Sequence, residues 1–124
     1  MPLAVNVMNG GHMSAASAQA INGNSVASAV TATGTLITDA ADLKADVNVI
    51  SAGAEGTGVQ LYQGMPGDDQ VIYNSTSTYK YVYPPSTLIA VNQLGVGNGF
   101  ILAPYTGVLC KAVTSTQWLG FLSA

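Results

Sequence analysis

The sequence predicts an all-β fold, namely an antiparallel β-sandwich or a jelly-roll-like barrel preceded by an extended N-terminal arm. From residue 47 onward, short runs rich in β-branched and aromatic residues recur every 8–12 residues or so. Stretches rich in glycine, asparagine and proline separate these runs and predict turns. No strict internal repeat is visible, which disfavours a solenoid. Together, the spacing and the missing repeat favour a sandwich or a barrel.

Residues 1–25 are interpreted as the arm. Asn-Gly pairs at 9–10 and 22–23 interrupt any regular element, and residues 14–20, "SAASAQA", lack a large apolar face. The remaining chain, residues 26–124, is long enough for a single β-sandwich domain.

The domain begins with a β-branched run and a short polar segment. Residues 26–38, "VASAVTATGTLIT", predict one or two strands broken at Gly34. Residues 38–46, "TDAADLKAD", predict one short helical turn, which Thr38 or Asp39 would cap.

The later strands follow from alternation and from the turns that bound them. Pro84-Pro85 ends one of them, because proline cannot donate to a β-ladder. The predicted strands cover residues 47–50, 58–62, 70–74, 79–83, 87–92, 100–103, 107–114 and 117–122.

Composition disfavours several functions. Charged residues make up 7% of the chain, there is no arginine, and the three lysines are dispersed, so no basic patch for nucleic acid is expected. No apolar run has the length of a membrane-spanning helix. A surface so poor in charge has few charged residues to prevent its sheet edges from pairing with other chains. We therefore expect neighbouring chains to cover much of this surface.

Catalytic residues are scarce, and we predict neither an enzyme nor a bound cofactor or metal. His12 is the only histidine and lies in the arm, and Cys110 is interpreted as a small buried hydrophobe. Clustered carboxylates at Asp39, Asp42 and Asp46, and at Asp68 and Asp69, are explained by capping and turns. The stretch "GVGNG" at 95–99 is a hairpin turn rather than a phosphate loop.

An aromatic stripe stands out at Tyr79, Tyr81 and Tyr83. Alternate residues of a strand share a face, so the three rings should lie together with Lys80 on the opposite face. Three roles remain open: a face buried between subunits, a core face, or a ligand platform such as a carbohydrate site. The sequence does not give the direction of the stripe.

The second half of the chain resembles small β-rich structural proteins of tailed bacteriophages, and the similarity covers about residues 46–118. The order and spacing of six segments carry it. These are "DVNVI" (46–50), "GTGVQL" (56–61), "VIYN" (71–74), "YVYPPS" (81–86), "GNGFILA" (97–103) and "TSTQW" (114–118). Lys80 departs from the apolar residue expected on its strand.

The resemblance implies a head decoration (cement) protein that binds the major capsid protein on the outer capsid surface of the virion. Such proteins are commonly homotrimers and not enzymes. The alternatives are a trimeric tail fibre, spike or head-fibre module, or a carbohydrate-binding module. Contacts with partners are expected from residues 1–13 and the edge at 79–85. The candidate interface residues are Pro2, Leu3, Val5, Val7, Met8, Tyr79, Tyr81, Tyr83, Pro84 and Pro85.

Overall fold

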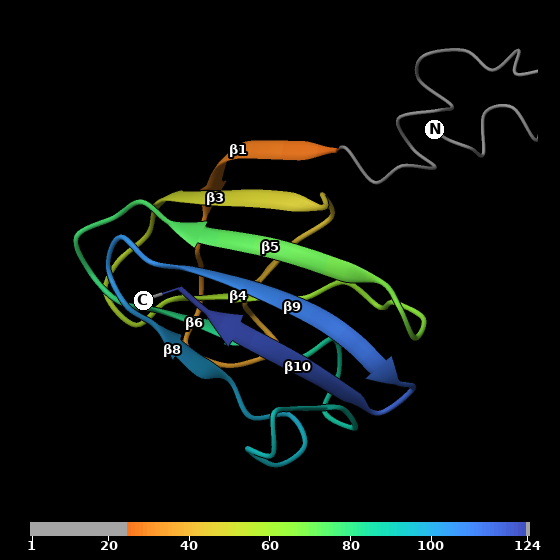
Figure 1. Ribbon diagram of the computed structural model, residues 1–124. Helices are drawn as coiled ribbons and strands as arrows, with labels where there is room; N and C mark the ends of the chain where they lie inside the picture. Colours follow the sequence, from red (N-terminus) through yellow and green to blue (C-terminus); the bar gives the residue numbers. More distant parts are fainter. Residues whose placement is uncertain (1–24, 124) are drawn as a thin grey trace, which may run out of the picture.

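The computed structural model describes residues 25–123, which form ten β-strands and no helix (Figure 1). The prediction of an all-β fold is therefore confirmed. The strands are β1 (Val26–Thr31), β2 (Ala41–Asp42), β3 (Val47–Ala52), β4 (Gly58–Gln60), β5 (Asp69–Asn74), β6 (Lys80–Tyr83), β7 (Ala90–Val91), β8 (Phe100–Leu102), β9 (Gly107–Thr114) and β10 (Gln117–Leu122).

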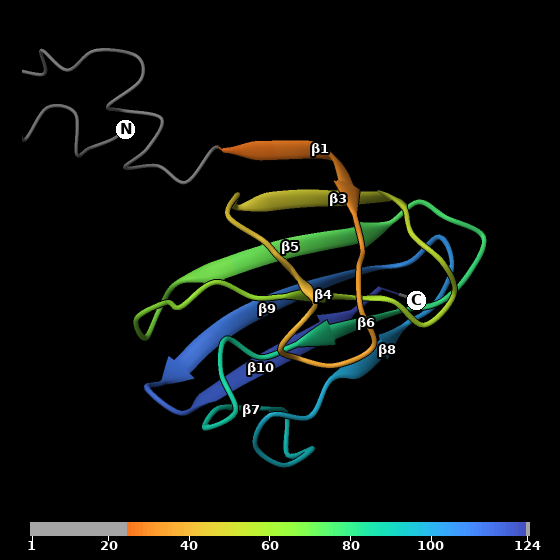
Figure 2. The same ribbon diagram turned by 180° about the vertical axis from the view of Figure 1, so that it is seen from behind.

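The strands lie in two facing sheets. The larger sheet has the order β1-β3-β5-β9-β10-β7, and the smaller has the order β2-β4-β6-β8. From β1 to β9 the chain changes sheet at every connection, and Figure 2 shows the smaller sheet in front of the larger one. The first six strands therefore wind as a coil with two strands in each turn.

Parallel pairing defines this coil. Strands β1, β3 and β5 pair parallel in the larger sheet, and β2, β4 and β6 pair parallel in the smaller one. Val26 lies beside Val47, and Val47 lies beside Val71. One turn of the coil thus takes 21 to 24 residues between neighbours in register.

The last four strands close the structure in a different way. β8 pairs antiparallel with β6, and β9 pairs antiparallel with both β5 and β10. β7 is a two-residue strand that pairs parallel with β10 at the far edge. A short parallel coil is thus finished by an antiparallel hairpin.

The structure does not have the expected antiparallel sandwich or jelly roll, and the prediction that a solenoid is disfavoured is wrong. The first six strands read as a β-solenoid. A coil with two short strands per turn produces the same strand length and the same spacing of turns as a sandwich. A three-turn coil also does not need similar sequences in its turns, so no repeat was visible.

The predicted helical turn at 38–46 is also wrong. Residues 37–39 form a turn, and Ala41 and Asp42 form β2. Asp39 Oδ1 accepts a hydrogen bond from the Leu36 amide at 2.8 Å, so this carboxylate closes a turn instead of capping a helix. The strand expected at 87–92 is likewise reduced to β7, because Thr87 and Leu88 lie in a turn.

The core lies between the two sheets. Inward-facing residues of the larger sheet meet those of the smaller sheet, and all of them are almost fully buried. The main members are Ile50, Val59, Ile72, Val82, Leu102, Val108, Cys110 and Trp118. The Trp118 indole makes an edge-to-face contact with Tyr62, with ring centroids 6.2 Å apart.

The buried amide side chains of Asn48, Gln70 and Asn74 share this interior and bind backbone groups of the crossings. Gln70 Nε2 donates to the Ala45 carbonyl at 2.9 Å, and Gln70 Oε1 accepts from the Tyr62 amide at 3.1 Å. Asn74 Nδ2 donates to the Thr78 carbonyl at 2.9 Å. Crossings between sheets leave backbone groups without ladder partners, and these amides satisfy them.

Replacing Gln70 by leucine is expected to lower the free energy of unfolding by about 2–3 kcal/mol, because buried backbone groups lose their partners. The measurement is urea unfolding of the variant against the parent chain. Gln93→Leu is the matched control, since Gln93 is exposed, and it should change stability little. Equal stability of both variants would contradict the role given to Gln70.

Candidate functional site

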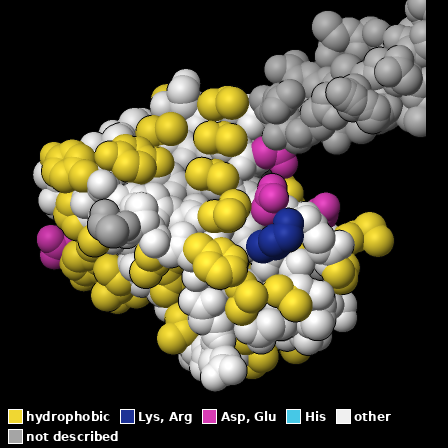
Figure 3. Space-filling view, viewed as in Figure 1, with side chains coloured by type: hydrophobic (Ala, Val, Ile, Leu, Met, Phe, Trp, Pro, Cys, Tyr) yellow, Lys and Arg dark blue, Asp and Glu magenta, His cyan; other side chains and the backbone are white. Residues whose placement is uncertain are grey.

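A row of apolar side chains crosses the outer face of the larger sheet. Its members are neighbours in register on five consecutive strands, and we call them the apolar row. They are Val26, Val47, Val71, Leu109 and Phe121. Figure 3 shows this face, with yellow side chains in a line down the sheet.

Strand alternation turns this row away from the core. On β9, Val108 and Cys110 are buried while Leu109 between them is 38% exposed. The ends of the row are more open, with Val26 62% and Phe121 56% exposed. Tyr73 on β5, 40% exposed, widens the same face. A continuous exposed apolar face of this kind is typical of a surface that binds another protein.

Charge lies beside the row. Lys111 Nζ is 3.6 Å from Asp69 Oδ2, and both side chains are about half exposed (Figure 3). An exposed pair of this kind contributes little to stability. The Lys111–Asp69 pair places polar groups along one side of the apolar row. Protein interfaces typically have a polar rim of this kind around an apolar centre.

The tyrosine stripe forms as predicted. The Tyr79 and Tyr81 rings meet edge to face at 5.8 Å, and the Tyr81 and Tyr83 rings stack at 6.0 Å between centroids. Lys80 and Val82 lie on the opposite face, fully buried. The three rings thus share the outer face of the smaller sheet.

Unlike the other two tyrosines, however, Tyr83 is covered by its own chain. Its side chain is 8% exposed, and its hydroxyl donates to the Thr35 carbonyl at 3.1 Å. Gly58 and Gly99 lie against its ring, where an added Cβ would come within 2.5 and 2.7 Å of ring carbons. Burial raises the pKa of this hydroxyl. Tyr79 and Tyr81 are half-buried and remain available to a partner, as does Pro85, whereas Pro84 is buried.

Lys80 is buried, and within residues 25–123 it forms no salt bridge, although the charge of Glu55 acts on its ammonium group from a distance. Its ammonium donates to the Thr76 hydroxyl at 3.0 Å, to the Thr78 carbonyl at 3.3 Å and to the Thr78 hydroxyl, and all three acceptors are neutral. Burial lowers the pKa of the ammonium group. The three donors of the lysine find acceptors in the 76–78 turn, which explains how a charged residue occupies an apolar position on β6.

Within residues 25–123, no group of three or more His, Cys, Asp or Glu side chains lies close enough together to hold a metal ion. Cys110 lies in the core, as expected, and burial raises the pKa of its thiol to about 12. Asp68 Oδ2 accepts from the Met65 amide at 2.8 Å, which is turn chemistry. His12 and the arm candidates Pro2, Leu3, Val5, Val7 and Met8 lie outside the described residues.

The Cys110 thiol predicts a stability change at alkaline pH. An unfolded thiol titrates near pH 9, whereas the native one keeps its proton to about pH 12. Above pH 9 the unfolded chain binds fewer protons, so the free energy of unfolding falls by about 1.4 kcal/mol per pH unit. Urea unfolding between about pH 8 and pH 11 should show a shallower decline for Cys110→Ala. Parallel declines would contradict the buried thiol.

The apolar row was not predicted from the sequence, although the residue pattern of two strands indicated an apolar outer face. Strands β5 and β9 carry apolar residues at both odd and even positions, as in "VIY" and "VLCKAV". Strands that are apolar on both faces are typical of sheets covered on both sides. The pattern therefore indicated a second covered face, outside the core.

Comparison with known proteins identified no relative of this chain. The chain matched no protein-family model, no curated protein and no solved structure. No helix within residues 25–123 is long and apolar enough to span a membrane.

Proposed function

We propose that this chain is a structural virion protein, a head decoration (cement) protein of a tailed bacteriophage that works as a homotrimer on the outer capsid surface. The apolar row is the observation that carries the docking part of this proposal. The capsid part rests on the resemblance of residues 46–118 to small phage structural proteins. The proposal includes neither catalysis nor a cofactor, and neither nucleic acid nor membrane as a partner.

In this proposal the apolar row is buried between subunits. Its face has few charges to desolvate, so covering it with a like surface costs little. Residues 1–13 and the edge around Tyr79, Tyr81 and Pro85 contact the major capsid protein. Repetition of these contacts by the symmetry of the shell raises the overall affinity without requiring a strong single contact.

A fibre, spike or head-fibre module is the second candidate. The parallel coil of β1 to β6 favours it, because parallel coils extend by stacking further turns on their ends. Immunogold labelling of the phage particle separates the two candidates. Label over the whole head supports decoration, label at the tail or on fibres supports the rival, and particles without label would contradict both.

Deleting residues 1–13 should weaken binding to the capsid shell while the fold stays intact, because the deletion leaves all ten strands in place. The measurement is co-sedimentation of the truncated and full chains with shells stripped of this protein. Thermal unfolding of the truncated chain is the control for folding. Full binding by the truncated chain would contradict the role assigned to the arm.

A further inference from the structure

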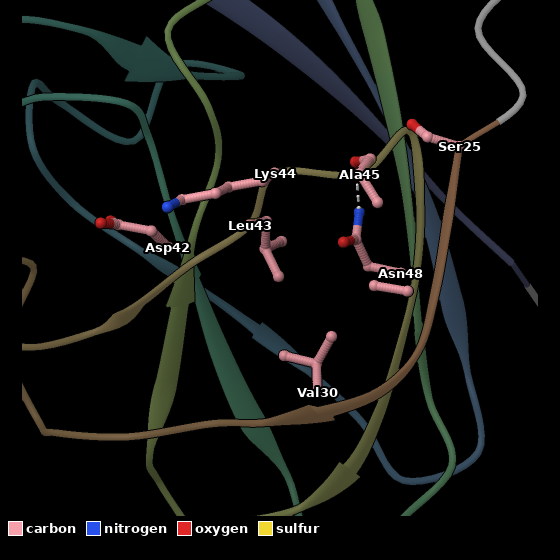
Figure 4. A pocket seen from close by; sticks show the side chains of 8 residues that line it. Ser25, Val30, Asp42, Leu43, Lys44, Ala45 and Asn48 are labelled. Atoms are coloured by element: carbon pink, nitrogen blue, oxygen red, sulfur yellow. Dashed lines mark hydrogen bonds between the residues drawn. The ribbon is translucent and has the colours of Figure 1, made fainter. Parts of the chain in front are cut away.

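The coil has an open end beside β1 and β2, the outermost strands of their sheets, and a cavity of about 310 Å³ lies there. No described strand pairs with the outer edge of either strand. Figure 4 shows that side chains from β1, from the crossing after β2 and from β3 surround this space. Its inner walls are formed by Ala27, Val30, Leu43, Ala45 and Asn48.

Most of the inner wall is apolar. Leu43 is 2% exposed, Ala45 is buried, and Val30 packs against the core from β1. Ala27 contributes only a methyl group on the β1 side. The wall therefore offers an apolar molecule a surface that is already part of the core, and burying apolar area there is favourable.

Polar side chains at the rim do not compete for a ligand. The Ser25 hydroxyl donates to Asp46 Oδ2 at 2.7 Å and accepts from the Asp46 amide at 3.0 Å, so it is engaged within the chain. Asp42 and Lys44 are both exposed and carry opposite charges. The residues that line the cavity thus have no net charge, which favours a neutral ligand.

One buried acceptor in the cavity lacks a donor. The Asn48 side chain is fully buried, and its Nδ2 donates to the Ala45 carbonyl at 2.8 Å and to the Val71 carbonyl at 3.4 Å. Carbonyl oxygens only accept, so these two contacts fix which end of the amide is the nitrogen. Asn48 Oδ1 has no donor among the described residues, and Figure 4 shows this oxygen directed into the cavity. Because an unpaired buried acceptor costs free energy, a ligand that carries a donor is favoured.

We propose that this cavity binds a small, neutral, mainly apolar molecule with a single hydrogen-bond donor, of about the size of indole. The donor binds Asn48 Oδ1, and the apolar body lies against Val30 and Leu43. The volume agrees with this, because an apolar cavity of about 150 Å³ holds a benzene molecule and ligand pockets begin near 300 Å³. Water is a poorer occupant, since an ordered buried water typically has two to four polar partners.

The cavity is independent of the apolar row. Val26 and Val47 of the row alternate with Ala27 and Asn48 along β1 and β3, so the two sets lie on opposite faces of the larger sheet. Ligand binding therefore goes beyond the proposed role in the virion and does not depend on self-association.

NMR titration of the isotope-labelled chain of 124 residues with indole tests the proposal. Indole should shift the signals of the Asn48 side-chain amide and of the Leu43 and Ala45 backbone amides. Benzofuran is the matched probe, because it has nearly the same shape with an oxygen acceptor in place of the N–H donor. We expect indole to bind about ten-fold more tightly than benzofuran. Equal affinities of the two probes, or a folded chain that binds neither because its own residues fill the cavity, would overturn the proposal.

A substitution that fills the cavity gives a second readout. Ala27→Phe places a ring in the open space and should abolish the indole shifts. Ala29→Phe is the matched control, since Ala29 is exposed on the same strand and does not line the cavity, and this variant should bind indole as the parent chain does. Undiminished binding by Ala27→Phe would contradict the site. The comparison of the two probes on the parent chain stays decisive if Ala27→Phe fails to fold.

Discussion

Replacing Trp118 by alanine should lower the free energy of unfolding by about 3–5 kcal/mol, a large share of the stability of a domain this size. Trp118 is 1% exposed, packs between the two sheets and contacts Tyr62. Its removal leaves a cavity that the surrounding strands of the coil cannot fill. Denaturant unfolding followed by far-ultraviolet circular dichroism gives the value.

Leu119→Ala is the matched control for this prediction. Leu119 is the next residue of β10 and lies on the outer face, 36% exposed. Its truncation should change the stability of the monomer by much less than the loss of Trp118. A loss below about 1 kcal/mol for Trp118→Ala would contradict the core described here.

Replacing both Leu109 and Phe121 by aspartate should prevent self-association. The two side chains are cross-strand neighbours in the apolar row, so the variant places two carboxylates in the proposed interface. Desolvating these charges without partners should weaken the association constant by about 100-fold or more. Both positions face solvent in the single chain, so the fold should remain. Sedimentation velocity gives the association state.

The control for this variant moves the same change to another surface. Leu88 is 73% and Ile101 is 53% exposed, and neither belongs to the apolar row. Leu88→Asp with Ile101→Asp adds the same charge and should leave the association state as it is in the parent chain. Equal effects of the two double variants would show that net charge, and not the apolar row, governs association.

The sequence predicted local structure better than connectivity. Residues 47–50, 70–74 and 117–122 were identified as strands because alternation and turn residues are local signals. The parallel pairing of Val26, Val47 and Val71 depends on how the chain crosses between sheets. The sequence of a single strand does not specify how the chain crosses to the other sheet. A sandwich built from hairpins would also have the same turn residues and the same strand spacing as the parallel coil.

The candidate site was predicted in part. Alternation was sufficient to place Tyr79, Tyr81 and Tyr83 on one face, and the structure confirms this. It was not sufficient to show that Tyr83 is covered by its own chain, because the Thr35 carbonyl that binds its hydroxyl is 48 residues away in the sequence. The apolar row was missed for a related reason. Its members come from five strands, and only the pairing register aligns them.

The native mass of the untagged chain of 124 residues, measured by sedimentation across a range of concentrations, is the decisive measurement for self-association. It tests the proposal that the apolar row of one chain is covered by other copies of the same chain. We expect a trimer at working concentrations, and a monomer for the Leu109→Asp, Phe121→Asp variant under the same conditions. A folded parent chain that stays monomeric at every concentration would contradict it.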